Sequence, residues 1–162
     1  MTNKQQQEIF FRYQLDILMK EIDLIDKTIG RLDEILLRNR NWGTTLWAGL
    51  IAIILQQGNF EKSFILATSI LPLLFWVIDV RWKMALLRSS DRQKVITDFL
   101  NSPALTKAFE TNTISSIGLL DPVGVSLPAG EWNYFVKAIR YKDTPIFYPA
   151  LVLCNLLLSI LI

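Results

Sequence analysis

Stretches without any charged residue alternate with strongly charged stretches along this chain. Three runs contain no Asp, Glu, Lys or Arg, and they cover residues 41–60, 63–78 and 144–162. A helix of about 20 residues spans the hydrocarbon core of a bilayer, which is roughly 30 Å thick. The second run is short for this, but Lys62 and Arg81 at its ends can extend toward water. The pattern therefore predicts three membrane-spanning helices.

The segment before the first run has a strict hydrophobic repeat. Apolar side chains alternate between spacings of four and three residues, which is the a/d pattern of a coiled-coil seam. No Pro interrupts this segment, so we expect one helix that continues into the first span. The seam is our candidate oligomerisation surface, and packing against the chain's own cytoplasmic helices is the alternative. It consists of Phe11, Leu15, Leu18, Ile22, Ile25, Ile29, Leu32 and Leu36.

The region between the second and third runs combines short helices with a loop. Residues 79–100 carry apolar side chains at helical spacing, so they extend the second span as an amphipathic helix. Ser102 is placed to cap a short helix over 103–110. Gly and Pro punctuate residues 111–130, which predicts a loop. Residues 131–141 then form another short helix with one apolar face.

Together these elements predict an all-α integral membrane protein in four parts. They are a heptad helix (1–41), a hairpin of two spans (42–80), a cytoplasmic helical region with the loop (81–143), and a third span (144–162). Basic residues precede the first span and follow the second, and few lie between them. The positive-inside rule then places the N-terminus in the cytoplasm and the far end of the third span outside. The expected location is the inner cell membrane, with several passes.

Composition removes most kinds of chemistry. The chain has 162 residues, of which 51% are hydrophobic and 20% are charged, and it contains no His. Without His there is no imidazole base, no Ser-His-Asp triad and no His ligand for zinc. Cys154 is the lone Cys, which excludes an internal disulfide and a Cys cluster. We expect no enzymatic activity and no cofactor.

Net charge argues against a nucleic-acid partner. The chain has 17 basic and 15 acidic residues and a net charge of +2. Nucleic-acid binders concentrate basic residues to neutralise phosphates, and this balance offers no such excess.

Several residues in the spans are candidates for helix packing or for lining a pore. The first span has small residues four apart, a spacing that lets helices approach closely within the protomer or between subunits. A Pro should kink the second span near its middle, and an Asn deep in the third span should donate an interhelical hydrogen bond. These residues are Thr45, Ala48, Gly49, Ala52, Pro72 and Asn155.

Charged residues beside the second span are candidates for a pore mouth or a ligand. Asp79 lies at the predicted cytoplasmic edge, where it could guard a pore or pair with a cation, and pairing with Arg81 or Lys83 is the ordinary alternative. The nearest thing to a basic cluster for a nucleotide signal follows it, and a positive-inside flank accounts for the same residues equally well. That cluster is Arg88, Arg92 and Lys94.

Two stretches carry a resemblance to a known family. They are IDLIDKTIGRLDEILLRNRNWGTTLWAG at residues 22–49 and FWVIDVRWKMALLRSSDRQKV at residues 75–95. In layout, over residues 10–100, the chain resembles small bacterial two-span effector proteins of the SLATT kind. The resemblance implies a role in nucleotide-signalled antiviral defence and assembly into membrane pores. The run at 144–162 is additional to that two-span layout.

Two functions follow as expectations. The first is a homo-oligomeric membrane protein that forms a pore, perturbs the membrane as a defence effector, or acts as a small channel. The second is a non-catalytic membrane anchor or scaffold that docks a soluble partner through its cytoplasmic region. The expected partners are the lipid bilayer, other copies of the chain, and a cytoplasmic protein or nucleotide signal.

Overall fold

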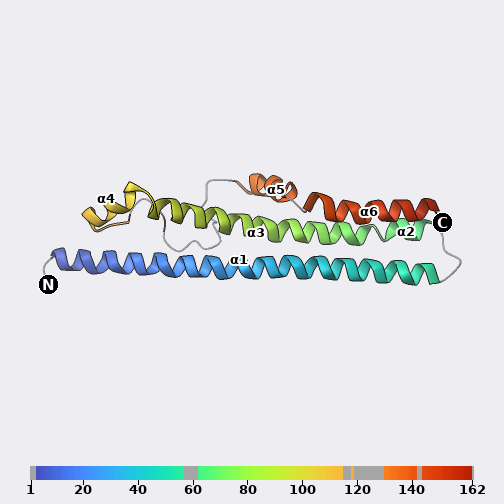
Figure 1. Cartoon of the computed structure of the whole chain (residues 1–162), viewed down its shortest axis with the longest axis horizontal. Coiled ribbons are helices and arrows are strands. Elements are labelled where there is room, and N and C mark those ends of the chain that lie inside the picture. Colours follow the sequence, from blue (N-terminus) through green and yellow to red (C-terminus); the bar gives the residue numbers. More distant parts are fainter. Residues whose placement is uncertain (1–2, 57–61, 115–117, 119–129, 142–143, 162) are drawn as a thin grey trace. The chain divides into compact units, whose positions relative to one another are not determined.

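The computed structural model describes residues 3–56, 62–114, 118, 130–141 and 144–161, and most of these residues lie in helices (Figure 1). No strand occurs among them. Most of the loop predicted over 111–130 lies outside the described residues. The helices are α1 (Asn3–Gln56), α2 (Lys62–Ala67), α3 (Ile70–Leu100), α4 (Pro103–Thr111), α5 (Glu131–Ile139) and α6 (Thr144–Leu161).

The two long helices have the continuity that the sequence predicts. α1 runs without interruption from the charged segment into the first apolar run, and α3 runs from the second apolar run to Leu100. Ser102 caps α4 as expected, because its Oγ accepts a hydrogen bond from the Ala104 backbone N–H at 3.2 Å. α5 ends at Ile139, two residues earlier than the predicted helix.

A break at Thr68 and Ser69 separates α2 from α3. Pro72 explains it, because Pro has no N–H for the carbonyl four residues earlier and its ring clashes with that carbonyl. The Thr68 carbonyl instead accepts from the Leu71 N–H at 3.2 Å, and the Ser69 N–H donates to the Leu66 carbonyl at 3.0 Å. Both are the tighter i to i−3 bonds of a 3₁₀ turn. The kink predicted near the middle of the span therefore lies one turn before Pro72.

One helix is long and apolar enough to cross a membrane. It is Lys62–Leu100, which takes α2 and α3 together across their break. The apolar part of α6, Ile146–Leu161, is shorter. The run at 41–60 ends outside the described residues, so only residues 41–56 of that predicted span can be assessed in α1. Of the three predicted spans, one is a candidate by length and composition in the described part of the chain.

The chain divides into two compact units, and its two long helices contribute to both. Unit 1 consists of Met1–Arg31 and Ala85–Gly130, and unit 2 consists of Leu32–Met84 and Glu131–Ile162. This division differs from the four predicted parts. The boundary in α1 falls ten residues before the first apolar run begins, and α5 belongs with the apolar helices.

Unit 1 has a hydrophobic core built on α1. Phe11, Leu18 and Ile25 recur every seven residues on one stripe of α1 and are buried. Phe11 also meets the ring of Phe109 edge to face, with centroids 5.1 Å apart. The partners in the core are Ile96 and Phe99 of α3, Ala108 of α4, and Ile114, which lies three residues after α4.

The heptad seam is therefore used within the chain. Five of its eight residues are buried in the protomer: Phe11, Leu18 and Ile25 in unit 1, and Leu32 and Leu36 in unit 2. The other three, Leu15, Ile22 and Ile29, are partly buried against the core of unit 1. Packing against the chain's own helices is the alternative that the structure supports. The buried side chains are not available to bundle copies, so the oligomerisation role predicted for the seam does not hold for them.

A buried ion pair crosses the core of unit 1. Arg92 on α3 donates from Nε to Glu21 Oε1 at 2.8 Å and from Nη2 to Oε2 at 3.1 Å. Both side chains are almost completely buried. Arg92 Nη2 also donates to the Gly118 carbonyl. The guanidinium therefore donates to three acceptors. Its two bonds to the Glu21 carboxylate have the bidentate geometry that makes such pairs strong and directional.

Removing one partner of this ion pair should destabilise the protein strongly. Glu21→Met or Arg92→Leu leaves a buried charge without its partner and should lower the free energy of unfolding by about 3–5 kcal/mol. The double variant Glu21→Met/Arg92→Leu should recover most of that loss, because no buried charge remains. Thermal unfolding of the full-length chain, followed by circular dichroism, measures these differences.

The exposed pair between Arg12 and Glu8 supplies the matched control. Arg12→Met should cost less than about 1 kcal/mol, because exposed ion pairs contribute little. A double variant as unstable as the sum of the two single variants would contradict the coupling between Glu21 and Arg92.

Candidate functional site

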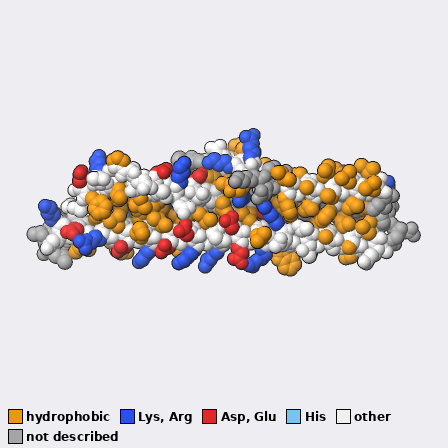
Figure 2. All heavy atoms as spheres, viewed as in Figure 1, with side chains coloured by type: hydrophobic (Ala, Val, Ile, Leu, Met, Phe, Trp, Pro, Cys, Tyr) orange, Lys and Arg blue, Asp and Glu red, His pale blue; other side chains and the backbone are white. Residues whose placement is uncertain are grey.

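Unit 2 has many apolar side chains on its outside, and its interior contains polar groups as well as apolar ones. Figure 2 shows hydrophobic side chains gathered over α6, α2 and the first part of α3. The exposed residues include Leu46, Leu50 and Ile53 on α1, Ile70, Leu73, Leu74 and Val77 on α3, and Leu153, Leu157 and Ile160 on α6. The buried residues include Asp79, Thr68, Thr144 and Asn155. This is the reverse of the arrangement that water favours.

The first set of interior polar contacts, which we term the boundary node, joins α1, α3 and α6. Asp79 has no exposed surface, and its Oδ2 accepts from Arg40 Nε at 3.3 Å and Nη2 at 3.1 Å. Asn39 Nδ2 donates to the Phe75 carbonyl at 3.2 Å and to the Tyr148 hydroxyl at 3.4 Å. One charge pair and one amide therefore hold three helices in register.

The second set, which we term the inner node, surrounds Asn155 of α6. Trp47 Nε1 on α1 donates to Asn155 Oδ1 at 2.9 Å, and Asn155 Nδ2 donates to Ser69 Oγ at 2.9 Å. Asn155 is fully buried. The interhelical hydrogen bond expected of Asn155 is confirmed, and its acceptor Ser69 lies in the break that Pro72 causes. The break thus supplies a side-chain acceptor that Asn155 reaches.

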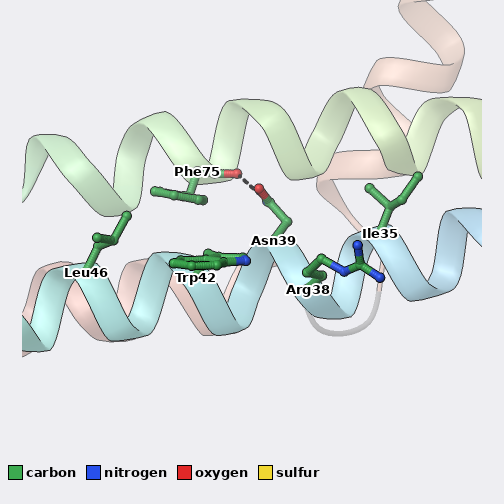
Figure 3. Close-up of a pocket in the computed structure, with 6 residues that line it drawn as sticks. All are labelled: Ile35, Arg38, Asn39, Trp42, Leu46 and Phe75. Carbon is green, nitrogen blue, oxygen red and sulfur yellow. Dashed lines mark hydrogen bonds between the residues drawn. The ribbon is translucent and has the colours of Figure 1, made fainter.

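Close packing between α1 and α3 depends on Gly43, which the sequence did not single out as a contact. A Cβ at Gly43 would lie 3.0–3.3 Å from side-chain atoms of Phe75, so only Gly fits without a shift of the ring. A groove of about 340 Å³ lies beside this contact (Figure 3). Arg38 and Trp42 line it, together with Ile35, Asn39, Leu46 and Phe75. The Arg38 guanidinium is paired with Glu34 at 2.9 Å.

The small-residue face predicted on the first span is exposed. Thr45, Ala48, Gly49 and Ala52 all lie on the surface of α1. A Cβ at Gly49 would meet no atom within 4 Å. Among the described residues, this face has no close helical partner in the protomer, so the packing within the protomer predicted for it is not observed.

The predicted mouth and ligand charges are placed differently from the expectation. Asp79 pairs with Arg40, not with Arg81 or Lys83, and the Lys83 ammonium lies 3.8 Å from the centroid of the Tyr141 ring. The ion pair with Arg40 accounts for the burial of Asp79, so a role as a pore guard is not needed to explain that burial.

The predicted basic cluster does not form an open ligand site. Arg92 is 3% exposed and bound to Glu21, so it is not available to a nucleotide. Arg88 is half-buried and Lys94 is exposed. Three cations spaced along one helix in the sequence therefore have three different environments.

Sequence reasoning missed the partners of the buried polar groups. Arg40, Trp47 and Ser69 are functional in the sense that they satisfy Asp79 and Asn155. In the sequence, Arg40 is one of the basic residues that precede the first apolar run. A polar group buried in an apolar unit requires a partner. The few polar side chains on the neighbouring helices are therefore the candidates that the sequence offers.

Comparisons with known proteins return no match: no protein-family model, no curated protein and no solved structure corresponds to this chain.

Replacing Asn155 should weaken the attachment of α6. Asn155→Leu removes both hydrogen bonds of the inner node and should lower stability by about 0.6–2 kcal/mol, the range for interhelical hydrogen bonds in membrane proteins. The measurement is the thermal unfolding midpoint of the purified protein. Ser159→Ala is the matched control, because Ser159 donates only to the Leu156 carbonyl of its own helix. Equal midpoints for the two variants would contradict the node.

Two Gly residues of α1 should respond oppositely to the same substitution. Gly43→Ala forces the added methyl against Phe75 and should cost about 1–3 kcal/mol, as overpacking does. Gly49→Ala meets open space and should be neutral or stabilise the helix by up to about 1 kcal/mol. Unfolding midpoints of the two variants, measured side by side, test this. A Gly43→Ala protein as stable as Gly49→Ala would refute the close approach of α1 and α3.

Proposed function

We propose that the chain is a multi-pass protein of the inner cell membrane whose copies associate and permeabilise the membrane, as a pore-forming effector or small channel. In this proposal α1, the α2–α3 segment and α6 of unit 2 cross the bilayer. Unit 1 lies in the cytoplasm, on the side indicated by the basic residues that precede the first apolar run and follow the second.

One observation carries the membrane assignment, and it is the reversed polarity of unit 2. Exposing large apolar side chains to water is unfavourable by about 25 cal/mol per Å², and lipid removes that cost. In lipid, every buried polar group must find a partner inside the protein. The boundary node and the inner node meet that requirement for Asn39, Arg40 and Asn155, and for one oxygen of Asp79. Trp76 Nε1, Thr144 Oγ1 and the other oxygen of Asp79 have no hydrogen-bond partner among the described residues.

Support for self-association comes from the exposed small-residue face of α1. Lipid-embedded helices associate where small residues allow their backbones to approach, and Thr45, Ala48, Gly49 and Ala52 provide such a surface. No conducting path is needed inside one protomer if the lining forms between copies. The resemblance in layout to SLATT-type effectors favours the same assembly.

The second candidate function is a membrane anchor or scaffold. The observation that favours it is the buried heptad seam, because unit 1 uses this seam in its own core. The seam residues buried in unit 1 are then not free to bundle copies, and the charged surface of unit 1 would instead receive a soluble partner.

The particle mass and membrane leakage test the two candidates together. The full-length chain should resist alkaline carbonate extraction, and in nanodiscs or detergent it should form particles of four or more copies by mass photometry. Gly49→Leu fills the small-residue face and should reduce the particle to one copy and abolish dye leakage from vesicles. Its protomer should remain folded, because open space surrounds Gly49.

Leu153→Phe, which adds bulk at an exposed position of α6, is the matched control and should leave mass and leakage unchanged. Unmodified particles of one or two copies without leakage would overturn the pore and leave the anchor as the function. Release of the chain by carbonate would overturn the membrane assignment itself.

A further inference from the structure

The short helix α5 has apolar residues on two of its sides. One side faces the protein, since Tyr134 and Ala138 are buried. A second set of apolar residues lies beside it, with the spacing i, i+3, i+4 and i+7 that places side chains on one face of a helix. We term this set the α5 stripe, and it consists of Trp132, Phe135, Val136 and Ile139.

The α5 stripe is open to the surroundings of the protomer. Trp132 is 71% exposed, and the other three residues are partly exposed. The ring of Trp132 stacks on that of Phe135, with centroids 5.3 Å apart and an interplanar angle of 27°, so the two form one apolar surface. The exposed polar residues of this segment lie on its remaining side, and they are Asn133, Lys137 and Arg140.

The α5 stripe continues the exposed apolar surface of α3. Two cavities of about 340 Å³ and 80 Å³ lie between the two helices, and Val77, Arg81 and Phe135 line both of them. Val77 belongs to the apolar surface that lipid covers in the proposed function. Arg81, one turn further on, is exposed and marks the change from apolar to charged residues along α3. In a membrane protein this change marks the headgroup region.

The chain length between α5 and α6 also places α5 near that region. Only residues 140–143 separate Ile139, where α5 ends, from Thr144, where α6 begins. A connection of this length spans at most about 18 Å when it is fully extended. α5 and α6 are also in contact. Because α6 enters the bilayer at Thr144 in the proposed function, α5 has to lie close to the membrane surface.

We propose that α5 is an interfacial helix that lies in the headgroup layer of the cytoplasmic leaflet, with the α5 stripe against the acyl chains and its polar side toward water. Its partner is the lipid surface itself. Helices of this kind bury an apolar face at the boundary between headgroups and acyl chains. Trp suits this boundary because it has an apolar body and a polar N–H. The inference rests on the proposed function, since it requires unit 2 to lie in a bilayer.

Lipid is the occupant that the surrounding surface favours over protein. The α5 stripe and the apolar surface of α3 meet at Val77 and Phe135 without a polar boundary between them. A medium that covers one of them therefore extends onto the other. A soluble protein on the α5 stripe would have to cover Val77 at the place where lipid begins.

Spin-label accessibility of the full-length protein in nanodiscs tests the proposal. Cys154→Ala removes the native thiol, and Trp132→Cys or Asn133→Cys then places one nitroxide at adjacent exposed positions on different sides of α5. Oxygen concentrates among acyl chains, whereas a charged nickel complex stays in water. The ratio of oxygen to nickel collisions should be several-fold higher for the label at 132 than for the matched control at 133. Leu153→Cys, at an exposed position of α6, supplies the reference for lipid.

Equal ratios at the two positions, with both labels accessible to nickel, would place α5 in water and overturn the proposal. A label at 132 that neither reagent reaches would show that protein covers the α5 stripe, either a second copy or a soluble partner, and would overturn it too. If Trp132→Cys fails to fold, Val136→Cys on the same stripe carries the same expectation. A carbonate-resistant protein with α5 in water overturns this inference alone, and release by carbonate overturns the proposed membrane function as well.

Discussion

The charge of Asp79 must be satisfied inside the protein, and much of unit 2 follows from that requirement. Asp79 has no exposed surface, and its partner Arg40 comes from a different helix. Leaving either charge alone in such a place costs several kcal/mol, so α1 and α3 are held in the one register that brings the two together. Asn39, next to Arg40, then reaches the Phe75 carbonyl and the Tyr148 hydroxyl. The position of α6 is thus tied to the same pair.

The hydrogen bonds of the inner node make the otherwise apolar packing of its helices specific. Leu, Ile and Val side chains fit one another in many arrangements, and lipid offers them nearly the same environment as a neighbouring helix. Hydrogen bonds from Trp47 to Asn155 and from Asn155 to Ser69 distinguish one arrangement from the others. Pro72 takes part indirectly, because the break that it causes places Ser69 outside a regular helical turn.

Local features of the sequence predicted the helices well. Continuous periodicity and the absence of Pro give the length of α1, and Ser102 followed by Pro103 gives the start of α4. The position of the break was missed by one turn, because Pro acts on the carbonyl four residues before it and the pattern points only to Pro72. The apolar seam was identified correctly, but a heptad does not state which helix covers it.

The sequence pattern does not predict contacts between residues that lie far apart along the chain. Asp79 was compared with its neighbours Arg81 and Lys83, yet its partner lies 39 residues away. Arg92 was grouped with nearby cations, yet its partner Glu21 lies 71 residues away. Small residues on α1 were recognised as a contact face, but the contact within the protomer is at Gly43, because it depends on where Phe75 of α3 lies.

The order of the helices along the chain determines the order in which the two nodes can form during synthesis. α1, α2 and α3 leave the ribosome before α6 does, so Arg40 and Asp79 can meet while translation continues. Asn155 and Tyr148 arrive only afterwards. Until then Trp47 and Ser69 have no Asn155 to join them, and the early hairpin is held by its ion pair and by apolar contacts alone. The order of synthesis therefore allows α6 to join helices whose register the ion pair can already set.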